Sequence, residues 1–228
     1  MTVPMKIPPM MKDPFAFMLS MLSPYFFMLM YIPMVYRTTY RIVQEKELRV
    51  REIMRMMGMS DASYWASWFL YHTMISTAIS CIAYLLAGYG IFSFSDPTLI
   101  WAVFWLYGQA IFGLILFIQS FFQQARTAAV TAIIFYLGCS AVEAGGEKST
   151  YVGNIILSIF PTTCMTAMVK VVLGFEQNAL GVGWDSTTLD YKKYTVLTGL
   201  IMMVVSFSFW TLLGLYFEQV LPREFGRR

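Results

Sequence analysis

Long apolar runs separated by short polar stretches make up most of this chain. A helix needs about 20 apolar residues to cross the hydrocarbon core of a bilayer, and several runs reach that length. The strands of a membrane barrel would instead alternate between apolar and polar positions over about ten residues, and no such repeat occurs here. The pattern predicts an all-α, polytopic transmembrane helix bundle. Its five full spans are expected at about residues 15–36, 62–89, 98–122, 127–142 and 195–217.

A sixth apolar run, at residues 151–175, is split by Pro161 and carries Lys170 in its second half. Cytoplasmic loops carry an excess of positive charge, so the arginines distinguish a crossing from a hairpin. Five spans plus a re-entrant extracytoplasmic hairpin place every arginine on one side, whereas a sixth crossing would separate them. We therefore expect a hairpin, which membrane depth tolerates where protein buries it. The arginines are Arg37, Arg41, Arg49, Arg51, Arg55, Arg126, Arg223, Arg227 and Arg228.

Two helix starts are marked by their local sequence. Ser60 is a residue type that caps helix N-termini, and Asp61 follows it in the first turn, where the helix dipole favours an acid. Asp96 and Pro97 form the same kind of signal, because proline suits the first position of a helix. These residues predict the starts of the second and third spans.

A charged segment at residues 44–58 lies directly between the first two spans. Four of its apolar residues follow the i, i+3, i+4, i+7 spacing of one helix face. Gly58 suits the left-handed position that ends many helices. The segment is therefore predicted to form a short cytoplasmic helix. The four apolar residues are Val50, Ile53, Met54 and Met57.

Acids and arginines in this segment are spaced for ion pairs along one helix. Glu45 with Arg49, and Glu47 with Arg51, stand four residues apart with the acid first, an arrangement worth about a few tenths of a kcal/mol per pair. Two interpretations stay open from these residues alone. The helix rests on the lipid surface, attracted by anionic headgroups, or it docks on a protein partner.

Composition places the chain among integral membrane proteins. It is 58% hydrophobic and 13% charged, about half the charged fraction of a soluble domain. A net charge of +3 is too small to indicate nucleic acid as a partner. Cys81, Cys139 and Cys164 lack metal-ligand spacing and are expected to be small core residues. We expect a multi-pass protein of the plasma membrane or an intracellular organelle membrane.

Three polar residues within the apolar runs have two interpretations each. His72 has no carboxylate or second histidine at helical spacing, which favours a neutral, hydrogen-bonded role over a functional one. Lys170 contacts a lipid phosphate or extends to the membrane interface as lysines often do. Gln119 lines a pathway for lipid headgroups or hydrogen-bonds a neighbouring helix.

Several motifs occur in a familiar order along nearly the whole chain. Residues 45–69 read EKELRVREIMRMMGMSDASYWASWF; SDP follows at 95–97, then FFQQARTAAV, FEQNALGVGWD at 175–185 and YFEQVLPREFG at 216–226. The set resembles the transmembrane domain of the A subfamily of ABC transporters, an ABC-2 type domain. The resemblance implies a lipid exporter or flippase whose fourth span is followed by an extracytoplasmic helical hairpin. It departs from the family at Ser206, where an acidic residue is usual.

The resemblance also implies where the domain meets its partners. A helix at residues 44–58 would rest on a nucleotide-binding domain, and Glu218 with the LPREFG segment would lead into that domain. A second transmembrane domain and membrane lipids would complete the partners, in the same polypeptide or in separate chains. The coupling surface carried over is Glu45, Glu47, Arg49, Arg51, Glu52, Arg55 and Met56.

An ATPase needs a G-x-x-x-x-G-K-[ST] loop to hold phosphate, and the chain has none. GGEKST at 145–150 places Glu147 before the lysine and follows no strand. We therefore expect residues 1–228 to be one partial transmembrane domain, lacking a first span, whose ATP and Mg²⁺ are bound by other domains. A truncated or regulatory membrane protein that joins transporter subunits without transporting is the alternative.

Overall fold

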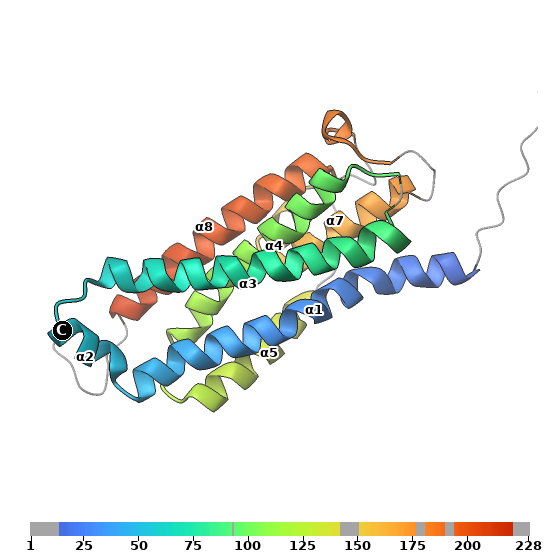
Figure 1. Ribbon diagram of the computed structural model, residues 1–228. Coiled ribbons are helices and arrows are strands. Elements are labelled where there is room, and N and C mark those ends of the chain that lie inside the picture. Colours follow the sequence, from blue (N-terminus) through green and yellow to red (C-terminus); the bar gives the residue numbers. More distant parts are fainter. Residues whose placement is uncertain (1–13, 93, 142–150, 177–180, 190–193, 221–228) are drawn as a thin grey trace, which may run out of the picture.

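The computed structural model describes residues 14–92, 94–141, 151–176, 181–189 and 194–220, and these fold without a strand (Figure 1). The all-α prediction is confirmed. The GGEKST and LPREFG segments lie outside the described residues. In chain order the elements are α1 Pro14–Glu47, α2 Val50–Met56, α3 Asp61–Gly90, α4 Pro97–Gln119, α5 Ala125–Ala141, α6 Tyr151–Leu157, α7 Pro161–Glu176, the 3-10 helix η1 Trp184–Ser186, and α8 Val196–Val220.

Helix α4 is the core of the bundle. It is apolar along its whole length, and most of its side chains are buried. α3 and α8 run along α4, α1 packs on α4 and α5, and α2 lies at one end of the bundle with η1 at the opposite end (Figure 1). α3 and α4, which correspond to the second and third predicted spans, begin where the sequence predicts: the Ser60 hydroxyl accepts the Ser63 N–H at 3.2 Å, and Asp96 precedes Pro97 at the start of α4.

Three of the described helices are long and apolar enough to cross a membrane: α3 over Asp61–Gly88, α4 and α8. α5 is apolar but shorter, with Ala125–Ser140 as its apolar part. The chain is therefore integral to a membrane. The predicted count of five spans, and the placement of the hairpin in the bilayer, stay predictions.

The boundary between the first predicted span and the charged helix differs from the sequence prediction. α1 continues through Pro24 and Pro33 and ends only at Glu47, whereas α2 has seven residues. Residues 34–47 contain no glycine or proline, so nothing local ends the helix. The extension carries Glu45 and Lys46 to the end of the bundle where α2 lies.

The helix break that Pro161 predicts is present between α6 and α7. α8 holds this break, because Ser206 Oγ and Trp210 Nε1 both donate to the Ile159 carbonyl, at 2.7 and 2.9 Å. α7 itself is buried over most of its length. Ser206 therefore fixes the hairpin at the position where the resembling family carries an acid.

Glycines bring the backbones of α4 and α8 close together. A Cβ on Gly214 of α8 would lie 2.6 Å from the Leu116 carbonyl carbon, and a Cβ on Gly113 of α4 would lie 2.8 Å from the Phe207 carbonyl oxygen. Small residues allow this kind of approach between membrane helices. The most extensive helix contact in the bundle thus depends on two positions without side chains.

The end of the bundle opposite α2 is tied together by the motifs at residues 94–98 and 175–185. Glu176 accepts the Phe94 N–H at 2.6 Å and the Ser95 hydroxyl at 2.7 Å, and Ser95 in turn accepts the Val182 N–H at 3.1 Å. Gly181 has φ +54°, and any side chain there would overlap the Phe94 carbonyl. Hydrogen bonds between these two sequence motifs therefore connect the end of α7 to the turn between α3 and α4.

Candidate functional site

The short helix α2 is bounded by two left-handed residues. Arg49 precedes it with φ +56°, and Gly58 follows it with φ +96°, as the sequence predicted for that glycine. The Gly58 N–H donates to the Arg55 carbonyl and the Met59 N–H to the Met54 carbonyl, at 3.0 and 3.1 Å. This pair of bonds satisfies the free carbonyls of the last turn. α2 is thus a defined unit between two sharp turns.

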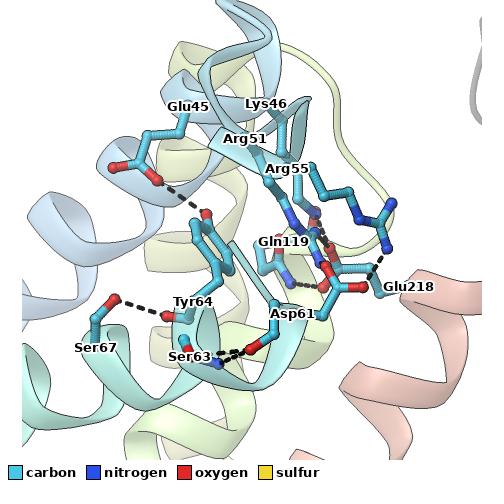
Figure 2. Close-up of polar contacts among 11 residues, drawn as sticks. Glu45, Lys46, Arg51, Arg55, Asp61, Ser63, Tyr64, Ser67, Gln119 and Glu218 are labelled. Atoms are coloured by element: carbon cyan, nitrogen blue, oxygen red, sulfur yellow. Dashed lines mark hydrogen bonds and ion pairs between the residues drawn. The ribbon is translucent and has the colours of Figure 1, made fainter. Parts of the chain in front are cut away.

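Arg51 is the one buried residue of α2, with 7% of its surface exposed. Its guanidinium lies 4.7 Å from the centre of the Tyr64 ring and 5.1 Å from the Trp65 ring, both at the start of α3. It forms ion pairs with Glu218 on α8 and, at 3.3 Å, with Asp61 (Figure 2). The planar guanidinium of arginine suits this combination of ring stacking and carboxylate pairing.

The carboxylate of Glu218, near the end of α8, contacts donor side chains from three other helices. Besides Arg51 of α2, its carboxylate faces Lys46 Nζ of α1 at 3.5 Å and accepts from Gln119 Nε2 of α4 at 3.0 Å (Figure 2). Lys46 Nζ also donates to the Gln119 carbonyl at the end of α4, at 3.3 Å. Only 7% of Glu218 is exposed. Removing one partner of such a buried pair costs about 3–5 kcal/mol.

The two glutamates before α2 also bond to other helices, although Glu45 is only half-buried and Glu47 is exposed. Glu45 accepts from the Tyr64 hydroxyl at 2.9 Å and from Trp68 Nε1 at 3.3 Å. Glu47 accepts the Ala125 N–H at 3.0 Å, at the start of α5, where a carboxylate offsets the positive end of the helix dipole. The predicted ion pair between Glu47 and Arg51 within one helix is wrong, because the helix breaks between them and each finds a partner on another helix.

A second set of α2 residues points outward. Glu52 and Arg55 are exposed, and so are Ile53, Met56 and Met57, with Met56 at 80%. Arg55 pairs with Asp61 at the surface. The predicted apolar stripe therefore does not pack into the bundle as a unit: Met54 is half-buried against the core, whereas Ile53 and Met57 face away from it.

The predicted coupling residues thus separate into two groups. Glu45, Glu47 and Arg51, together with Glu218, contact other helices of the bundle, whereas Glu52, Arg55 and Met56 form an exposed surface with Ile53 and Met57. Arg49 is exposed at the turn before α2. We call the first group, with Lys46, Asp61 and Gln119, the α2 cluster; Arg51, Gln119 and Glu218 are its buried members. We call the exposed group the α2 surface.

Two polar residues inside the helices, Gln119 and His72, are buried and hydrogen-bonded to other helices. Gln119 is fully buried and makes the interhelical hydrogen bond that was one of its two interpretations. His72 is fully buried, and its Nε2 lies 2.9 Å from the Gly108 carbonyl, as expected for a neutral, hydrogen-bonded histidine. Lys170 is half-buried on α7. Lipid headgroup contacts of Gln119 and Lys170 stay predictions. Cys81 is exposed, so its assignment to the core is wrong.

The sequence analysis missed Lys46 and Asp61 as members of the α2 cluster. Lys46 lies in the charged stretch before α2, and Asp61 lies shortly after α2. Their charge and their nearness to α2 were the signals that could have identified them. The partner of Arg51 lies 167 residues away, and no local pattern indicates such a pairing.

Comparisons with known proteins agree with these motifs. Residues 1–216 match the family model described as ABC-2 family transporter protein. ATP-binding cassette sub-family A member 17 of Mus musculus is 26% identical over 96% of this chain and 13% of its own length. The retinal-specific phospholipid-transporting ATPase ABCA4 of Homo sapiens is 26% identical over 97% and 10%, and the cholesterol transporter ABCA5 of Homo sapiens 24% over 86% and 12%. The chain spans about a tenth of the length of these relatives.

Proposed function

The chain belongs to the ABC-2 family of transporter proteins, and we propose that it is the membrane part of an ATP-driven transporter that moves lipids between bilayer leaflets. Two relatives carry phospholipid and cholesterol transport in their names, which supports lipid as the substrate class. ATP and Mg²⁺ would be bound by nucleotide-binding domains outside these residues. A second transmembrane domain would complete the transport unit.

The observation that carries the proposal is the exposed α2 surface at one end of the bundle. Ile53, Met56 and Met57 are large apolar side chains next to the charged Glu52 and Arg55. An apolar centre with a charged rim is typical of a protein interface. Arg49 and Arg55, which are among the arginines that predict the cytoplasmic side, are exposed at this end, and a nucleotide-binding domain would find ATP on that side. These features favour docking on a protein over the lipid surface as the role of α2.

Photo-cross-linking from α2 tests this docking in native membranes. We expect benzoylphenylalanine placed at Met56, which is 80% exposed, to cross-link to a peptide of an ATP-binding cassette that mass spectrometry identifies. The matched control is the same group at Leu189, an exposed residue near η1 at the opposite end of the bundle. Cross-links from Met56 to lipid alone would contradict docking and support a helix resting on the membrane surface.

A further inference from the structure

The attachment of α2 to the bundle is unusual for a helix that carries apolar residues. Surface helices normally pack through an apolar stripe, but in α2 the residues Ile53, Met56 and Met57 are exposed and Met54 is only half-buried. Val50 is half-buried as well, and the one buried residue of α2 is the charged Arg51. The position of α2 relative to the other helices is therefore set mainly by what its guanidinium contacts.

The backbone isolates α2 from the helices on either side. Its backbone hydrogen bonds run within the seven residues and their flanking turns, from the Arg49 carbonyl at the start to the Met59 N–H at the end. Both flanking turns contain a residue with positive φ. A force on the α2 surface would therefore move the helix as one body about these two turns, and Arg51 would move with it.

Glu218 would transmit such a movement from α2 to the other helices of the bundle. Its carboxylate binds Arg51 directly and is held at the same time by Gln119 Nε2 of α4, at 3.0 Å. α4 is the buried core helix, and α8 packs along it through Gly113 and Gly214. Because the carboxylate is buried and takes charged donors, it follows the guanidinium more closely than an exposed pair would.

We propose that Arg51 and Glu218 form a relay that transmits displacement of α2 to α4 and α8, with Gln119 as a positioning residue for Glu218. The relay rests on the proposed docking of a nucleotide-binding domain on the α2 surface. In this relay, Arg51 and Glu218 transmit movement inside the membrane domain, whereas the exposed residues of the α2 surface contact the nucleotide-binding domain. Loss of the relay separates ATP hydrolysis from lipid movement without removing the docked partner.

The relay is tested in membrane vesicles that contain the assembled transporter, by counting phospholipid molecules moved per ATP hydrolysed. We expect Arg51→Gln and Glu218→Gln each to lower this ratio by about tenfold, within the usual range for coupling between sites. The double variant is expected to lose no more than either single variant, because both remove the same link. Arg126→Gln is the matched control: Arg126 is an exposed arginine at the start of α5, outside the α2 cluster.

A third variant keeps the test decisive if the charge changes prevent folding. Gln119→Leu removes a donor to Glu218 without leaving a charge unpaired, and it preserves most of the side-chain volume. We expect it to lower the lipid-to-ATP ratio by about fivefold, the lower end of the coupling range. A ratio equal to that of the unmodified protein in Gln119→Leu, or in both charge variants, would overturn the relay.

Cross-linking from Met56 in the same vesicles distinguishes failure of the relay from failure of the docking. If the cross-link to the nucleotide-binding domain forms and the ratio is unchanged in the variants, the relay is wrong and the docking stands. If the cross-link is absent even with Arg51 and Glu218 intact, the docking is wrong and the relay fails with it. A cross-link that persists while the ratio falls is the result the relay predicts.

Discussion

Replacing Arg51 by glutamate is expected to destabilise the membrane domain by about 3–5 kcal/mol, the usual cost of breaking a buried ion pair. The new carboxylate would face Glu218 and Asp61, which both pair with the arginine. It would also lose the attraction that the Tyr64 and Trp65 rings offer a cation. The measurement is the temperature at which half of the detergent-solubilised protein is lost from its folded peak in size-exclusion chromatography.

Two further variants show whether this loss comes from the buried charges. Arg126→Glu changes an exposed arginine of α5 in the same way, and we expect a transition temperature close to that of the unmodified protein. Adding Glu218→Gln to Arg51→Glu removes one of the opposed charges and should recover part of the lost stability. A double variant that is less stable than Arg51→Glu would contradict the contact between Arg51 and Glu218.

Replacing Gly214 by leucine is the second change with a large expected effect. A Cβ at this position already lies 2.6–2.8 Å from backbone atoms of Leu116 and Phe117 on α4, so the rest of a leucine side chain has no room. Overpacking usually costs about 1–3 kcal/mol, and we expect more here because backbone atoms of a buried helix cannot move aside. The same thermal measurement in detergent tests this prediction.

A glycine outside the α4–α8 contact provides the control for this change. Gly138 lies on α5, and a Cβ there would meet no atom within 4 Å. Gly138→Leu should therefore leave the transition temperature unchanged or slightly raised, since leucine favours a helix more than glycine does. Equal transition temperatures for Gly138→Leu and Gly214→Leu would show that close packing of α4 and α8 does not hold the bundle together.

Features encoded by neighbouring residues were predictable from the sequence. Ser60 marks a helix start through its side-chain cap, and Asp96 with Pro97 through the fixed backbone angle of proline; Pro161 marks a break. The structure places helix starts at or directly after these residues. Gly58 likewise ends α2 in the left-handed conformation. These signals act over one turn of helix, so a single sequence is sufficient to read them.

The orientation of α2 was not predictable in the same way. A helix of seven residues makes barely two turns, and its apolar spacing does not determine which side faces the bundle. That choice depends on Glu218 and Gln119, which lie 167 and 68 positions along the chain from Arg51. The resemblance therefore placed Arg51 on the coupling surface, whereas the structure buries its side chain against Glu218.

The extent of α1 shows the same limit. The charged residues 44–47 suggested a helix separate from the first span, because charges usually end a membrane-spanning segment. Charges do not end the helix itself, however, and α1 continues to Glu47, where Glu45 and Glu47 find partners on α3 and α5. The apolar pattern indicates which residues contact the membrane, whereas the length of a helix depends on its backbone hydrogen bonds.

The central claim is that this chain is the membrane part of an ATP-driven lipid transporter. Its most direct test measures the transfer of a fluorescent phospholipid between leaflets in vesicles that contain the protein as the cell assembles it. The account predicts transfer that requires ATP and Mg²⁺ and stops with a non-hydrolysable ATP analogue. A transfer rate that is the same with and without ATP, or no greater than that of protein-free vesicles, would contradict it.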